Sequence, residues 1–160
     1  MEATVKNRPV VSAEKQLSGF IAKFDPEYQK LIRSVRKALR QRFPGAYELV
    51  YDNYNFFVIG YSPTERPSDA IVSVAAGASG VGLCFIRGAK LPDPHGLLLG
   101  SGKQTRFIRL DSAAVLARPE VDALIGTAIA RAKPLRPRGR VELIIRSVSA
   151  KQRPRRKAPK

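Results

Sequence analysis

Residues 25–61 read DPEYQKLIRSVRKALRQRFPGAYELVYDNYNFFVIGY, and this stretch holds a helix, a stop and two strands in succession. Asp25 and Pro26 form a helix start, because Asp is a good N-cap and Pro is favoured at the first helical position. Apolar side chains then recur at helical spacing until Pro44-Gly45, which ends the helix. The pattern predicts a helix from residue 26 to about residue 43, followed by β-structure.

Five short segments rich in β-branched and aromatic residues predict strands, and turn residues separate them. They are residues 47–51, 55–61, 70–76, 81–87 and 105–110. Short connections between consecutive strands imply antiparallel pairing. Several of these strands are apolar on both faces, so both faces need cover from helices, another sheet or a second subunit. A homo-oligomer is one way to supply that cover.

Two further helices are predicted on either side of the strands, at residues 14–24 and 119–132. We therefore expect an α+β fold, with an antiparallel sheet of about five strands and N-terminal helices and a C-terminal helix packed on it. The expected domain covers residues 14–133, after a flexible N-terminus at residues 1–13. A basic, Pro/Arg-rich tail at residues 134–160 follows, in which residues 141–147 could add one more strand. Residues 150–160 have the composition of a disordered segment.

Positive charge is concentrated at the C-terminus. The chain has 29 Lys and Arg against 13 Asp and Glu, a formal net charge of +16. Residues 131–160 hold 12 of the cations and one acid, so they carry +11, and residues 1–130 carry +5. This distribution predicts a non-enzymatic binding module whose cationic arm contacts nucleic acid or another polyanion; the alternative is a solubility tail. The candidate polyanion-binding residues are Arg136, Arg138, Arg140, Lys151, Arg153, Arg155, Arg156 and Lys157.

Polar side chains near two turns form a second candidate site, for a small ligand. Tyr51, Asp52 and Tyr54 lie beside a predicted hairpin turn, and Lys103 and Arg106 flank a glycine-rich loop whose backbone N–H groups could bind a small anion. The loop lacks the spacing of a phosphate-binding P-loop. The competing interpretation is that these residues supply turn chemistry, ring packing and solvated charge.

Several function classes are excluded or not indicated. One Cys rules out an internal disulfide framework and a Cys-only zinc site, and one His rules out sites that need two. No catalytic residue, metal ligand or cofactor is indicated. The first 15 residues are polar, and no run of about 18 apolar residues occurs, so we expect no secretory signal, no membrane span and a cytoplasmic location.

Two motifs, taken in order, resemble the YdhG-like family, domain of unknown function 1801. The first is FPGA at residues 43–46 with ELVYDNYN at 48–55; the second runs from LPDP at 91–94 through GSGK at 100–103 to RFIRL at 106–110. The resemblance covers residues 16–132. It implies helices on an antiparallel sheet, and no established activity for most members.

One branch of that family has been likened to frataxin, an iron chaperone, so the resemblance also implies an alternative function as a metal carrier or small-anion-binding protein. Iron in such a role takes oxygen ligands from carboxylates. The early helix here offers Asp25 and Glu27 against six cations.

Overall fold

The computed structural model describes residues 12–159, and residues 1–11 and 160 lie outside the described part, including most of the N-terminus expected to be flexible. Helices α2 and α3 come first, strands β1 to β5 follow, and α4 and β6 complete the chain. The bounds are α2 Ala13–Ile21, α3 Pro26–Arg42, β1 Tyr47–Asp52, β2 Phe57–Ser62, β3 Val72–Gly77, β4 Gly80–Phe85, β5 Arg106–Arg109, α4 Pro119–Arg131 and β6 Glu142–Val148. Three 3₁₀ turns lie between them: η1 Pro67–Asp69, η2 Gly88–Lys90 and η3 Ala113–Ala117.

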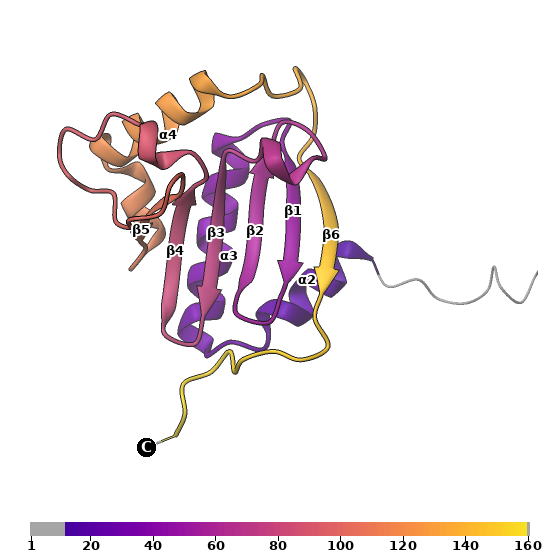
Figure 1. Cartoon of the computed structure of the whole chain (residues 1–160). Helices are drawn as coiled ribbons and strands as arrows, with labels where there is room; N and C mark the ends of the chain where they lie inside the picture. Colours follow the sequence, from indigo (N-terminus) through magenta and orange to yellow (C-terminus); the bar gives the residue numbers. More distant parts are fainter. Residues whose placement is uncertain (1–11, 160) are drawn as a thin grey trace, which may run out of the picture.

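The strands form one six-stranded sheet in the order β5-β4-β3-β2-β1-β6 (Figure 1). Strands β1 to β5 pair antiparallel, whereas β6 runs parallel to β1. The short connections from β1 to β4 favour antiparallel pairing, and β5 pairs in the same way after the long loop at residues 86–105. The predicted α+β class, with N-terminal helices and a C-terminal helix, is confirmed. Residues 141–147, which could add one more strand, correspond to β6.

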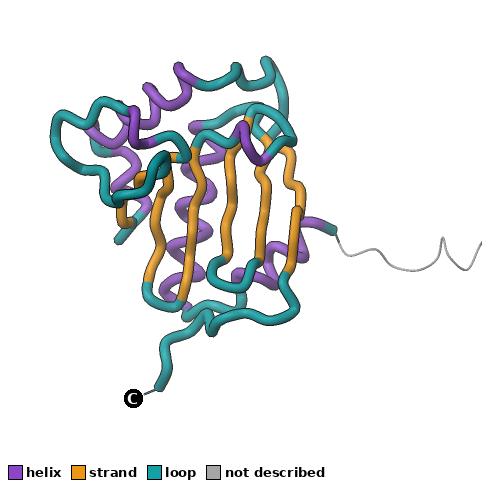
Figure 2. Tube along the Cα trace, in the orientation of Figure 1, coloured by secondary structure: helices purple, strands orange, loops and turns teal. Residues whose placement is uncertain are grey.

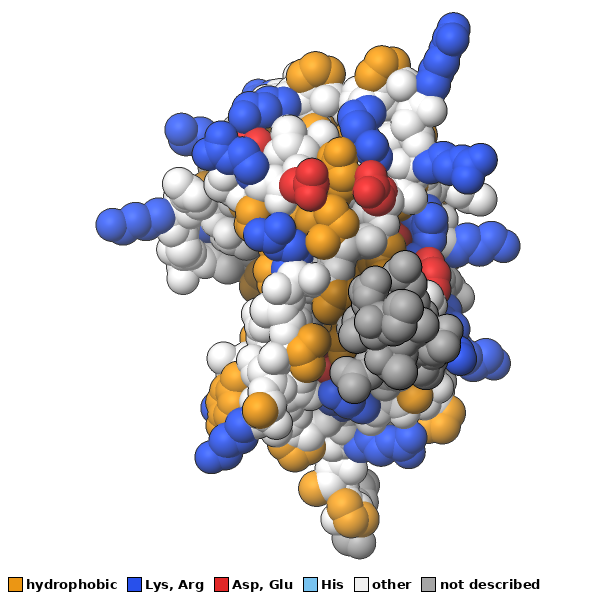
Figure 3. All heavy atoms as spheres, turned by 90° about the vertical axis from the view of Figure 1, so that its right-hand side faces the viewer, with side chains coloured by type: hydrophobic (Ala, Val, Ile, Leu, Met, Phe, Trp, Pro, Cys, Tyr) orange, Lys and Arg blue, Asp and Glu red, His pale blue; other side chains and the backbone are white. Residues whose placement is uncertain are grey.

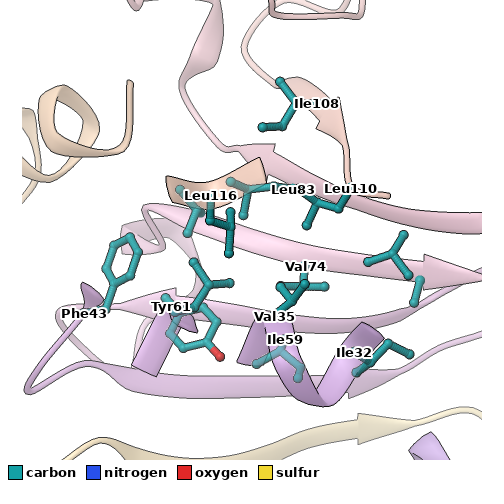
Figure 4. Packing of buried hydrophobic residues seen from close by; sticks show 14 of the residues in the cluster. Ile32, Val35, Phe43, Ile59, Tyr61, Val74, Leu83, Ile108, Leu110 and Leu116 are labelled. Atoms are coloured by element: carbon teal, nitrogen blue, oxygen red, sulfur yellow. The ribbon is translucent and has the colours of Figure 1, made fainter. Parts of the chain in front are cut away.

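The helices cover one face of the sheet. Figure 2 shows α2 and α3 behind the strands, and Figure 4 shows Val35 of α3 beside Ile59 and Val74 of the sheet. All three side chains are buried, because alternate residues of each strand point to this face.

No α-helix of residues 12–159 lies over the opposite face (Figure 1). Its residues include Val58, Ala75 and Cys84, which are half-buried. The expectation that both faces need cover is therefore not met within the described chain. Small residues such as Ala75, Ser73 and Gly82 share this face with the half-buried ring of Phe107.

Helix α4 packs beside the sheet, against η3 and the C-terminal end of α3. Its buried face consists of Val121, Leu124 and Ile125. Arg42 Nε donates to Asp122 Oδ1 at 3.0 Å and links the two helices. After α4 the chain crosses the top of the sheet to the far edge, where β6 begins (Figure 1). That crossing delivers β6 in the same direction as β1, which is why the pair is parallel.

Candidate functional site

The basic C-terminal segment, residues 134–159, is part of the folded domain. Strand β6 pairs along the whole of β1, and its Leu143 and Ile145 pack against the hydrophobic core. Residues 150–157 follow the lower end of the sheet and hydrogen-bond to the end of β1, to the turn after it and to the N-cap of α3, although their composition is typical of disorder. The segment is therefore ordered and packed against the domain, and it is not a free arm.

Arg136 holds the start of this segment. Its Nε donates to the Gly45 carbonyl at 2.9 Å, and its guanidinium lies 4.1 Å from the Tyr47 ring centre. Gly45 has φ of +81°, and a Cβ there would collide with the Arg136 carbonyl. The Pro44-Gly45 stop thus also makes room for the returning chain. Arg136 further contacts the Glu142 carboxylate at 3.3 Å, so it is engaged in holding the fold.

Arg155 anchors the other end and is buried, with 4% of its surface exposed. Its Nη2 donates to Asp52 Oδ1 at 2.9 Å and to the Asn53 carbonyl at 2.5 Å. Asp52 is fully buried, and its Oδ2 accepts from Lys23 Nζ at 2.7 Å. Gln152 Nε2 donates to the Asp52 carbonyl at 2.7 Å. Arg155 is therefore inaccessible to a polyanion in this conformation, because it neutralises a buried carboxylate.

The residues on either side of Arg155 are held by hydrogen bonds that involve the backbone. The backbone N–H of Arg153 donates to the Tyr54 carbonyl at 2.8 Å, and that of Lys157 donates to Asp25 Oδ2 at 3.2 Å. Arg156 Nε donates to the Lys23 carbonyl at 3.2 Å. All three side chains remain exposed.

The fold divides the candidate polyanion-binding residues into two kinds. Two of them, Arg136 and Arg155, stabilise the fold. The other six are exposed: Arg138, Arg140, Lys151, Arg153, Arg156 and Lys157. The first two precede β6 and the others follow it, so β6 separates them. Figure 3 views the molecule from the β6 side, and Lys and Arg side chains ring this view while acidic ones lie nearer its centre.

The second candidate site is not assembled. Tyr51, Asp52 and Tyr54 lie at or just beyond the end of β1, whereas Arg106 begins β5 at the opposite edge, with β2, β3 and β4 between them. The register also places them at opposite ends of the sheet, because Arg106 pairs with Phe85, the last residue of β4.

Individual residues of that candidate site have structural contacts. The Asp52 carboxylate is buried and paired with Arg155. Arg106 Nη1 donates to the Gly102 and Thr105 carbonyls and stiffens its own loop, while Lys103 is exposed. Burial raises the pKa of the Tyr51 hydroxyl, and the positive charge of Arg146 opposes that rise.

A buried polar network joins α3 to the sheet, and the sequence patterns did not predict it. Glu48 is fully buried and accepts from Arg36 Nε at 3.0 Å, Arg36 Nη2 at 2.9 Å and Tyr61 Oη at 2.8 Å. Burial, followed by the Glu48 charge, raises the pKa of Tyr61 well above its ordinary value. The only available signal was an acid inside an otherwise apolar strand.

Two searches of the described residues bear on other function classes. Residues 12–159 contain no group of three or more His, Cys, Asp or Glu placed to hold a metal ion. In the same range, no helix combines the length and apolar character needed to cross a bilayer.

Comparison with family models, with curated proteins and with solved structures gives no match to this chain.

Proposed function

We propose that this protein is a non-enzymatic binding module, a YdhG-like α+β domain, whose ordered C-terminal segment contacts nucleic acid through its phosphates. The observation that supports this is the set of six cations that stay exposed after the segment has folded onto the sheet. Within residues 12–159, the side chains of Arg138, Arg140, Lys151 and Arg153 have no acidic partner within 4.0 Å.

The spacing of these cations favours a polymer over a small anion. The seven residues of β6 lie between the two groups, and a strand of that length spans about 23 Å. Arg146 on β6 is exposed between them. A small anion cannot reach both groups, whereas duplex DNA carries one charge per about 1.7 Å of its axis. Because phosphates carry no base identity, the contact is expected to be weakly sequence-specific.

The order of the segment supports the same proposal energetically. Residues already held by backbone hydrogen bonds, such as Arg153 and Lys157, lose less conformational entropy on binding than residues of a free tail. If about six cations neutralise phosphates, the logarithm of the binding constant should fall with the logarithm of salt concentration with a slope of about −5.

The test is a fluorescence-anisotropy titration of a short DNA duplex and a single-stranded RNA at several salt concentrations. The variant replaces Arg138, Arg140, Lys151 and Arg153 with Gln. The control variant replaces four exposed cations on other elements with Gln, so the net charge changes equally. Those control positions are Lys30, Lys37, Arg109 and Arg118.

We expect the segment variant to bind at least tenfold more weakly and its salt slope to shrink by about 3 to 4. The control should keep most of the affinity. Equal losses in both variants would show that overall charge, not this segment, drives binding, and absence of binding by the native chain would refute the proposal. Circular dichroism melts confirm that each variant is folded.

A further inference from the structure

A cavity of about 340 Å³ lies where the C-terminal end of α4 passes over the start of β3 and the end of β4. Figure 1 shows this end of α4 above the strands, well away from β6. The cavity floor is apolar and includes Ile71, which is 5% exposed, and the fully buried Phe85. Ala128 of α4 forms part of the wall.

The cavity walls carry an excess of positive charge. Four cations line them, Arg87, Lys90, Arg131 and Lys133, against the single carboxylate of Asp69. Lys133 Nζ contacts Asp69 Oδ2 at 3.1 Å, and Thr64 Oγ1 donates to the same oxygen at 2.7 Å. These contacts, Thr64 first, lower the pKa of Asp69, so its charge offsets one of the four cations at neutral pH.

Both guanidinium groups are held in place by backbone carbonyls. Arg87 Nη2 donates to the Ser68 carbonyl at 2.7 Å, and Arg131 Nη1 donates to the Lys90 carbonyl at 2.7 Å. Each of these bonds uses one nitrogen of the guanidinium, which leaves further N–H donors for a ligand. Two segments of the chain, residues 87–90 and 131–133, thus place four exposed cations around one apolar cavity. An anion bound there would reduce their mutual repulsion.

We propose that this cavity binds a small amphipathic anion, a phosphate monoester with a compact apolar or aromatic group. Guanidinium groups match phosphate oxygens in a bidentate manner, and several cations around one opening suit a dianion. The floor of Ile71 and Phe85 takes the apolar group. A volume of about 340 Å³ lies at the lower end of small-molecule pockets. This ligand class and location differ from the polyanion contact at the β6 side.

The probes are phenyl phosphate, inorganic phosphate and phenol, measured by titration calorimetry and by the change in melting temperature of the full chain. We expect phenyl phosphate to bind with one-to-one stoichiometry and to raise the melting temperature. Inorganic phosphate should bind at least tenfold more weakly, and phenol should give no measurable binding. Methyl NMR signals of Ile71 and Ala128 should shift with phenyl phosphate.

Three variants test the location. Arg87→Gln with Arg131→Gln should weaken phenyl phosphate binding at least tenfold. Ala128→Leu keeps every charge but fills the cavity, and should also abolish binding, so the proposal does not depend on the arginine variant remaining stable. The Gln variant of Arg138, Arg140, Lys151 and Arg153 should bind phenyl phosphate as the native chain does, which separates this proposal from the nucleic-acid one.

The opposite results overturn the proposal. Equal affinity for phenyl phosphate and inorganic phosphate would mean that surface charge alone attracts the anion. Binding that survives both Ala128→Leu and the double Arg variant would place the ligand elsewhere, and no binding of phenyl phosphate would remove the site.

Discussion

The Asp52 carboxylate has no exposed surface and lies between two cations, Lys23 Nζ at 2.7 Å and Arg155 Nη2 at 2.9 Å. The Lys23 side chain is 43% exposed, whereas that of Arg155 is 2% exposed. Solvent screens the first contact but not the second. The Arg155 Nε and Nη1 atoms are buried without a hydrogen-bond partner among the described residues. The charge of Asp52 is therefore the main compensation for burying this guanidinium.

Replacing Asp52 with Asn should lower the free energy of unfolding by about 3–5 kcal/mol, because it leaves the Arg155 charge buried and uncompensated. Urea unfolding measures this. The control is Asp122→Asn, whose contact with Arg42 is largely exposed and should be worth less than about 1 kcal/mol. Adding Arg155→Met to Asp52→Asn should restore part of the loss. Similar losses for the two Asp→Asn variants would contradict the assignment of Arg155 as a buried anchor.

Tyr61 gives the fold a dependence on alkaline pH. Its folded-state pKa is raised well above the ordinary value by burial and by the Glu48 charge. The unfolded chain ionises its tyrosines near pH 10. The contribution of Tyr61 to the free energy of unfolding is therefore fully present below about pH 10. It is lost as the pH rises from there toward the folded-state pKa.

We expect the free energy of unfolding to fall above about pH 10, and to fall less steeply in Tyr61→Phe, by about 1 kcal/mol per pH unit. The variant should also lose about 1–3 kcal/mol at neutral pH, because Glu48 loses a buried donor. Urea unfolding at a series of pH values measures both effects. Parallel alkaline declines in the native chain and the variant would show that Tyr61 is not responsible.

At the scale of elements, β6 is the part whose removal is most informative. It covers the β1 edge, and Leu143 and Ile145 contribute to the core. A chain ending at Lys133 loses these contacts, exposes the backbone of β1 and leaves Asp52 without Arg155. We expect this chain to lose cooperative folding or to self-associate, as read by circular dichroism melts and size-exclusion chromatography. A chain ending at Ser149 keeps β6 and should remain folded and elute in the same oligomeric state as the full chain, with a lower melting temperature. Equal melting of the full chain and the 133-residue chain would refute the structural role of β6.

The elements differ in how far sequence patterns predict them. Helix α3 has local signals at both ends, Pro26 at its first position and Pro44-Gly45 after it, and it runs from Pro26 to Arg42 within one residue of the prediction. Helix α2 ends at Ile21 rather than at the predicted residue 24, with Ala22 as its C-cap. The strands of the two hairpins were also predictable, since their turns are short. The parallel pairing of β6 was not, because it depends on where the chain returns after α4.

At the scale of the whole molecule, the fold assigns the positive charge to different roles. Among the cations of residues 134–159, Arg155 is buried, Arg136 holds the returning chain, and the other six candidates are exposed on either side of β6. A second group, including Arg87 and Arg131, surrounds the cavity near α4. A net charge of +16 describes neither arrangement, because it counts cations without regard to their partners.

Capping, periodicity and composition are local properties, so the amino-acid sequence was enough to predict the α+β class, helices at residues 26 to about 43 and 119–132, and the concentration of charge at the C-terminus. Three features became visible only in the folded chain: β6 lies parallel to β1, Asp52 pairs with Arg155, and Arg106 lies at the opposite edge of the sheet from Tyr51. The fold also brings four cations from separate segments together over Ile71 and Phe85. These features join residues far apart in the chain, and burial, which sets their electrostatic strength, exists only once the chain has packed.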